Sequence, residues 1–181
     1  MTKAKLPMQD AKKCLQLFDQ LDLFILEQFE DKIIEKNKAY TDINEIRIQA
    51  RTYLINQPEV IDLFLSKTPS LTEEEKNILL RWKNYKTGRF IVIKCYKEYA
   101  IFFAYDNYKF YGVKALHDSF STVLPYKPPL IIQTRLFPYN DCIIWDGLVG
   151  VVPIAIGKNM AKIFKNDCND AHKNGEIITQ L

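Results

Sequence analysis

The sequence predicts an α+β fold in which helices come first and a mostly antiparallel sheet follows. Three observations predict it: apolar residues recur at helical spacing before Gly88, β-branched and aromatic runs replace them after it, and Asp-Asn and Asp-Gly pairs separate those runs. We expect an N-terminal helical region, 1–88, packed on a C-terminal β-rich domain, 89–181. The sheet is expected to be strongly bent or to form a small open barrel, with a further helix near the C-terminus.

Capping signals and apolar spacing predict four helices in the N-terminal region. Apolar residues recur at steps of three and four across 11–33, which is typical of an amphipathic helix. Asp42 and Thr72 each precede a glutamate by three residues, the capping-box pattern, so each marks the start of a helix. Pro58 suits the first turn of a short helix between these two. The fourth helix is expected to continue up to Gly88.

Short apolar and aromatic runs predict the strands. They lie at Phe90–Tyr96, Tyr99–Tyr105, Lys109–Val113, Leu130–Phe137, Cys142–Trp145 and within Leu148–Ile156. The first three are expected to form a meander, because Asp106-Asn107 suits a hairpin turn. One or two helical turns are expected within 115–124, and Asn159 is expected to cap the last helix. Pro153 implies that the sixth strand lies at an edge or contains a bulge.

Basic residues are concentrated in the middle of the chain. The formal net charge is only +3, but residues 76–135 carry 11 basic and 3 acidic side chains. No acidic residue lies between Lys76 and Lys97, and such a block can attract a polyanion or an acidic protein surface. The alternative is that these side chains have no partner and only face solvent on the surface of a helix and an edge strand.

Aromatic residues accompany this basic excess. Seven of the ten tyrosines lie between Tyr96 and Tyr139. Alternation along 90–96 predicts an exposed face of Phe90, Val92, Lys94 and Tyr96, and sheet platforms of this kind stack nucleobases while lysines contact phosphates. The candidate nucleic-acid-binding residues are Lys83, Lys86, Arg89, Lys94, Tyr96 and Lys97. A protein-binding face with tyrosine anchors has the same composition, and the spacing predicts that Tyr96 and Tyr99 lie on different surfaces.

Candidate catalytic residues are few. Asp141 and Asp146 flank a short predicted strand, and two carboxylates that meet at one sheet edge could hold Mg²⁺ for phosphoryl chemistry. His117, one of two histidines, could join them, but all three residues also suit turns or caps. Cys168 and His172 lie four apart on the last helix, without the second ligand pair that a structural zinc needs. With no phosphate-binding glycine motif either, we expect no metal and no cofactor.

Composition excludes several classes of protein. The longest uncharged stretch, Gly147–Gly157, has eleven residues, whereas a membrane span needs about 20. The N-terminal lysines are followed by no apolar run, so we expect no signal peptide. The four cysteines are widely spaced, which favours reduced thiols. We therefore expect a cytoplasmic protein without a membrane partner.

Short motifs in the C-terminal half resemble a group of uncharacterised bacterial proteins. The motifs are Tyr111-Gly112-Val113, Leu124-Pro125, Leu136-Phe137-Pro138-Tyr139, Ile143-Ile144-Trp145-Asp146-Gly147-Leu148 and Ile177-Ile178-Thr179-Gln180-Leu181. That group has a similar Tyr-Asp-Gly-Leu hairpin and Ile-Thr-Ser-Leu terminus, from which this chain departs at Trp145 and Gln180. The resemblance covers roughly residues 90–181 and implies a bacterial origin. It supplies no catalytic residue.

Three functions remain open on this basis. We favour a non-catalytic binding or adaptor protein whose partner is another protein. The first alternative is a protein that binds single-stranded RNA or DNA through a basic, tyrosine-rich sheet. The second is a metal-dependent hydrolase that uses Asp141, Asp146 and His117.

Overall fold

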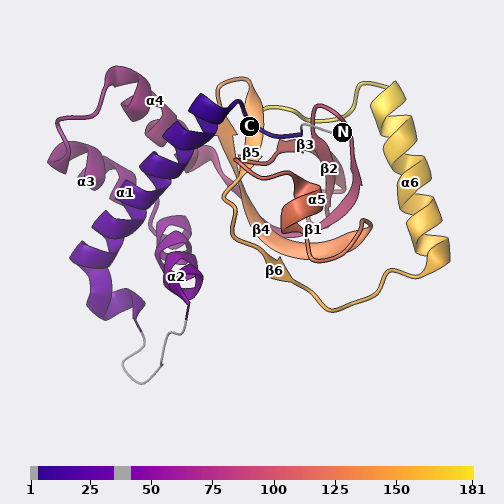
Figure 1. The fold of residues 1–181 in the computed structure, drawn as a ribbon, viewed down its shortest axis with the longest axis horizontal. Helices are drawn as coiled ribbons and strands as arrows, with labels where there is room; N and C mark the ends of the chain where they lie inside the picture. The colour runs from indigo at the N-terminus through magenta and orange to yellow at the C-terminus, as the bar shows by residue number, and fades with distance from the viewer. Residues whose placement is uncertain (1–3, 35–41) are drawn as a thin grey trace. The chain divides into compact units, whose positions relative to one another are not determined.

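The computed structural model describes residues 4–34 and 42–181, and it has the predicted α+β class (Figure 1). The chain divides into two compact units. The helical unit is Lys12–Lys83, and the barrel unit is Asn84–Leu181 together with Met1–Ala11. Among the described residues, no helix combines the length and the apolar character that crossing a lipid bilayer requires.

The predicted helices of the N-terminal region are all present. They are α1 (Met8–Ile33), α2 (Ile43–Asn56), α3 (Val60–Lys67) and α4 (Glu73–Arg81), followed by a 3₁₀ turn at Trp82–Asn84. Thr72 and Glu75 form the expected capping box, because the Glu75 amide donates to the Thr72 hydroxyl and the Thr72 amide donates to the Glu75 carboxylate. The prediction that α4 reaches Gly88 was wrong. The chain from Lys86 onward pairs with β4, so Gly88 lies inside a strand with φ of +151°.

The core of the helical unit contains a stack of aromatic rings and a cation. Phe18 of α1 stacks on Trp82 with ring centroids 3.9 Å apart, and the Arg51 guanidinium lies 3.7 Å from the centre of the Phe18 ring. Arg51 also forms a two-point hydrogen-bonded ion pair with Asp22, and both side chains are buried. A charge pair of this kind links α1 to α2 inside the unit.

The sheet of the barrel unit closes on itself. Its strands are β1 (Lys86–Cys95), β2 (Ala100–Ala104), β3 (Lys109–Lys114), β4 (Leu130–Tyr139), β5 (Cys142–Trp145) and β6 (Gly150–Val151). The first three form the predicted antiparallel meander. β3 pairs in parallel with β5, β5 pairs with β4, and β4 returns to pair antiparallel with β1. The described strands therefore form a closed barrel in the order β1-β2-β3-β5-β4, with β6 added beside β4.

A short helix, α5 (Phe120–Val123), lies between β3 and β4 in the sequence and packs against the barrel. Its Phe120 is buried, with ring centroids 5.4 Å from Phe102 and 5.1 Å from Trp145. A barrel with this strand order, a parallel β3–β5 pair and a helix between β3 and β4 has the connectivity of oligonucleotide/oligosaccharide-binding (OB) barrels. Proteins with many different functions share this connectivity. The function of this chain therefore has to be inferred from the residues of a particular site.

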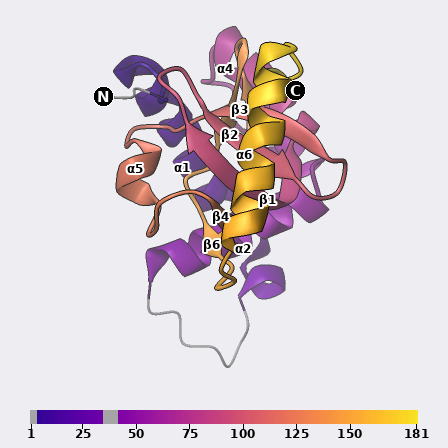
Figure 2. The ribbon, with the colours of Figure 1, turned by 90° about the vertical axis from the view of Figure 1, so that its right-hand side faces the viewer.

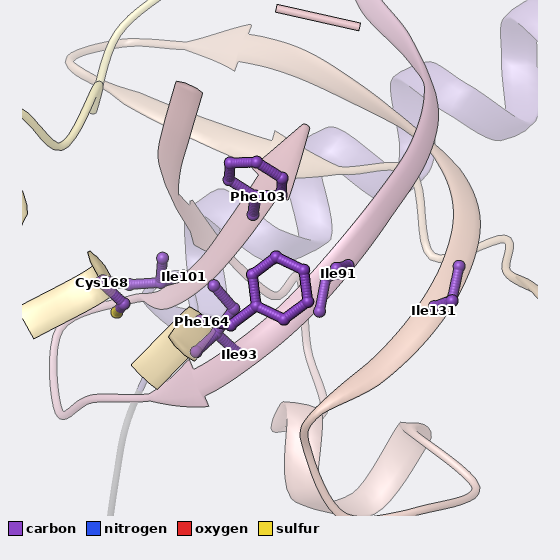
Figure 3. Packing of buried hydrophobic residues seen from close by; sticks show 7 residues of the cluster. All are labelled: Ile91, Ile93, Ile101, Phe103, Ile131, Phe164 and Cys168. Carbon is purple, nitrogen blue, oxygen red and sulfur yellow. The ribbon is translucent and has the colours of Figure 1, made fainter. Parts of the chain in front are cut away.

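The last helix, α6 (Lys158–Lys173), lies across the outer face of β1 and β2 (Figure 2). Its Phe164 and Cys168 pack into an apolar cluster that the strands complete with Ile91, Ile93, Ile101, Phe103 and Ile131 (Figure 3). Met160 and Ile163, in the first two turns of α6, remain about half exposed. The first turns of α6 therefore present apolar side chains to solvent.

Candidate functional site

The two candidate catalytic carboxylates lie at opposite ends of β5. Asp141 is exposed in the turn between β4 and β5, whereas Asp146 is buried just beyond the end of β5. The four-residue strand between them spans roughly 13 Å. Asp146 accepts a hydrogen bond from the Leu148 amide at 3.1 Å and lies 3.5 Å from a guanidinium nitrogen of Arg135. Its position is explained by the turn that it stabilises.

His117 lies in the segment that follows β3. It is exposed, and its Nδ1 lies 3.3 Å from an Asp118 oxygen. It lines a pocket of about 490 Å³ with Lys5 and Lys114. Within residues 4–34 and 42–181, no three histidine, cysteine, aspartate or glutamate side chains are grouped so that they could hold a metal ion.

The predicted nucleic-acid-binding residues are divided between the two units. Lys83 belongs to the helical unit and forms an ion pair with Asp62. Lys86 forms an ion pair with Asp106 of the β2–β3 loop at 2.8 Å. These two lysines therefore have carboxylate partners inside their own units. Arg89 and Lys97 are exposed, and Lys94 is exposed at the end of β1.

The predicted exposed face of β1 is not a stacking platform. Phe90 and Val92 are 1% and 0% exposed, because that face forms the interior of the barrel. A bulge between Val92 and Lys94 shifts the register, and this brings Lys94 to the outside. The bulge therefore interrupts the alternation on which the prediction of one exposed face was based.

Tyr96 is already packed against other rings. It stacks on His172 of α6 with ring centroids 5.0 Å apart, and the Lys94 ammonium lies 4.5 Å from the centre of its ring. Tyr99 lies 6.1 Å from Tyr96, so the prediction that these two tyrosines lie on different surfaces was wrong. The Tyr96 amide donates to the Tyr99 carbonyl, and this tight turn brings the two side chains together.

A pocket beside these rings is the strongest candidate site. It has a volume of about 630 Å³ and lies between the end of β1, the α5–β4 segment and α6. Ile93, Phe120 and Leu124 give it apolar walls. We call it the lysine-lined pocket, because Lys94, Lys127 and Lys165 reach it from three separate elements. None of the described residues that line it is an aspartate or a glutamate.

The charge of this pocket is positive, and its thiol is neutral. Burial raises the pKa of the Cys95 thiol, which lines the pocket, so the thiol stays protonated at neutral pH. Lys158, Lys162 and Lys165 follow one another at steps of four and three along α6 and so share one face of this helix. A stripe of positive charge therefore leads along α6 to the pocket.

No protein-family model matches the chain. No curated protein and no solved structure matches it either. The geometry and charge of the pocket are therefore the basis for assigning a ligand.

Most of the residues of this pocket were missed by the sequence reasoning. Only Lys94 was among the candidate residues, because Lys127 and Lys165 lie outside the stretch between Lys76 and Lys97 that has no acidic residue. Two signals could have found them. Tyr126 and Lys127 lie between Pro125 and Pro128, and prolines at this spacing predict an exposed loop. The lysines of α6 recur at helical spacing, which places them on one face of the helix.

Proposed function

We propose that the protein is a non-catalytic binding protein whose lysine-lined pocket takes an acidic segment of a partner protein, with one apolar side chain of that segment inserted between the lysines. The observation that carries this proposal is the lining of the pocket: lysines from three elements around apolar walls, with no carboxylate among the described lining residues. An acidic residue in the lining would lower the affinity of the site for anions. Because the described lining has lysines and no acidic residue, it favours an anionic ligand.

The apolar walls favour a side chain over a nucleobase. A leucine or phenylalanine side chain gains about 1.5–3 kcal/mol on full burial. A nucleobase would bury ring nitrogens and carbonyl oxygens that need hydrogen-bond partners. Ser121 and Asn169 are the polar uncharged side chains, other than that of Tyr126, among the described lining residues. Each exposed lysine–carboxylate contact adds only about 0.2–1 kcal/mol, so we expect a transient complex.

Single-stranded nucleic acid is the second candidate. Tyr126 is 69% exposed on the rim of the pocket, next to Lys127, and an exposed ring beside a cation can stack a base while the cation contacts a phosphate. The connectivity of the barrel is compatible with this alternative. Arg89 and Lys97 are further exposed cations of the same unit.

Charge reversal tests the role of the lysines. The probe is a fluorescein-labelled peptide of alternating glutamate and leucine, and its binding is measured by fluorescence anisotropy. We expect the double variant Lys127→Glu/Lys165→Glu to weaken binding by about tenfold or more, because two attractive contacts become repulsive. Lys173→Glu is the matched control for the α6 position: it makes the same charge change as Lys165→Glu alone, on the same helix, at a 75% exposed side chain outside the pocket lining. We expect it to change the affinity less than about twofold.

Filling the pocket tests the apolar insertion. Ser121 lines the pocket, and its exposed neighbour Thr122 is not among the lining residues. Both hydroxyls contact the Ser119 hydroxyl, at 2.8 and 3.0 Å, so the two positions lose comparable hydrogen bonds on substitution. We expect Ser121→Phe to abolish peptide binding and Thr122→Phe to preserve it. Equal effects of the two substitutions would contradict insertion into this pocket.

A labelled oligothymidylate separates the two candidate ligands. If nucleic acid is the ligand, it should bind more tightly than the acidic peptide, and its affinity should fall steeply with salt. Failure of both probes to bind at about 100 µM protein, an affinity weaker than about −5.5 kcal/mol, would contradict the proposed function.

A further inference from the structure

A second pocket adjoins the lysine-lined pocket at Tyr126. It has a volume of about 340 Å³ and is lined by Tyr126, Pro129, Leu130 and the extended segment Val151–Ile156. No charged side chain occurs among its described lining residues. We call it the apolar pocket. The side chain of Tyr126 is therefore shared by the walls of the two pockets.

One wall of the apolar pocket is an edge strand. β6 is the last strand in the order of the described sheet and pairs with β4. The Val152 amide continues this pairing by donating to the Ile131 carbonyl at 3.1 Å. Beyond it, Ile154 is 60% exposed.

This edge carries no charged side chain to discourage strand pairing. Exposed edges are normally protected by charged side chains, which discourage a second chain from adding to the sheet. The edge here belongs to the longest uncharged stretch of the chain, Gly147–Gly157. Its protecting devices are the length of β6, two residues, and Pro153, which removes a backbone donor within the segment. An exposed, apolar and uncharged edge beside a pocket is typical of strand addition by a bound peptide.

We propose that the partner segment binds in extended form along the edge of β6 and inserts two apolar side chains, one into each pocket, on either side of Tyr126. This proposal rests on the proposed function, since it names the composition and conformation of the same partner. The lysines line only the first pocket, so the acidic residues of the segment lie at that end and its uncharged residues lie at the apolar pocket.

Extended conformation predicts the spacing of the two anchors. Alternate residues of a strand point to the same side, about 7 Å apart for each step of two. Both anchors can therefore enter the pockets when they are separated by an even number of positions, and not when the separation is odd. A helical segment would instead place its anchors three or four positions apart.

Peptides of identical composition test this spacing. Labelled acidic peptides carry either one leucine anchor or two, with the second anchor two, three, four or five positions away. We expect the best even spacing to bind about tenfold more tightly than the one-anchor peptide, and the odd spacings to gain less than about twofold. N-methylation removes the hydrogen-bond donor of an amide. Methylation of the amides on one side of the best peptide should abolish this gain, and methylation of those on the other side should preserve it, because only one row of amides can donate to β6.

Two variants locate the second anchor. Ile154→Ser removes an exposed wall of the apolar pocket, and Ile163→Ser removes a similarly exposed isoleucine of α6 that lines neither pocket. We expect Ile154→Ser to remove the tenfold gain of the two-anchor peptide and to leave the one-anchor peptide unchanged. Ile163→Ser should leave both affinities unchanged. Circular dichroism verifies that both variants are folded.

The outcomes separate this inference from the proposed function. If the one-anchor peptide binds in a manner that depends on Lys127 and Lys165, but a second anchor adds less than twofold at every spacing, the proposed function stands and the two-anchor mode is overturned. A gain at three positions with none at two also overturns it, because it indicates a helix. Loss of oligothymidylate binding in Ile154→Ser, with no peptide bound, would assign the surface to nucleic acid and overturn both proposals.

Discussion

Replacement of Arg51 by methionine should destabilise the helical unit by about 3–5 kcal/mol, because it leaves a carboxylate buried without its counter-charge. Asp22 and Arg51 are each 3% exposed, and one guanidinium nitrogen lies 2.9 Å from an Asp22 oxygen. The same guanidinium also packs on Phe18, so methionine preserves part of the apolar contact but none of the charge. The loss should therefore come mainly from the orphaned carboxylate.

The pH dependence of this variant has a definite sign. Burial raises the pKa of the Asp22 carboxyl, and the Arg51 charge opposes this rise. Without Arg51 the pKa rises further. A carboxyl whose pKa is higher in the folded state favours folding when protonated, and this stability is lost as pH rises through the folded-state pKa. Arg51→Met should therefore be more stable at about pH 5 than at pH 7, whereas Asp22→Leu/Arg51→Met should show little of this dependence.

Urea denaturation followed by circular dichroism measures both effects, with the free energy of unfolding taken from the midpoint and slope of the transition. The double variant should recover most of the loss, because it removes the buried charge together with its partner. A loss below about 1 kcal/mol for Arg51→Met, equal at both pH values, would show that water reaches Asp22 and would refute the reasoning.

Three further substitutions test the fold. Phe164→Ala should cost about 3–4 kcal/mol by opening a cavity under α6, and it should speed proteolysis between 147 and 157; unchanged proteolysis would contradict the packing of α6. Gly112→Ala should cost about 1–3 kcal/mol, since its Cβ would lie 3.1 Å from the Tyr99 ring, and a thermal melt that matches the parent would show that the ring moves freely. Thr72→Ala should cost about 1 kcal/mol through loss of the capping box, with Thr72→Ser as the near-neutral control in the same melt.

The helices could be predicted because their signals are local. The Thr72–Glu75 capping box lies within one turn, and the apolar spacing of α1 repeats over the whole helix. The closure of the barrel could not be predicted in this way. It depends on pairing Lys86 with Leu136 and Val113 with Ile143, and local periodicity does not encode the register of strands so far apart in the sequence.

The candidate site illustrates the same limit. Ile91 and Ile93, which alternate with the predicted exposed face of β1, lie in a core cluster, but Phe90 and Val92 are buried as well, because the other face of the strand lines the barrel. A strand covered on both sides shows no polar face, so its alternation cannot be used to find an exposed surface. Lys127 and Lys165 meet Lys94 at one pocket only because the barrel and α6 bring them there, and no spacing in the sequence shows this.

The most direct test of ligand binding at the lysine-lined pocket is a titration of the ¹⁵N-labelled chain with the two-anchor acidic peptide, followed by amide chemical shifts. We expect the largest shifts at residues 93–95, 124–128, 151–156 and 165–169, with saturation at one peptide per chain. Residues 43–83 of the helical unit should show small shifts. Shifts spread evenly over exposed lysines, or confined to the helical unit, would contradict binding at this pocket.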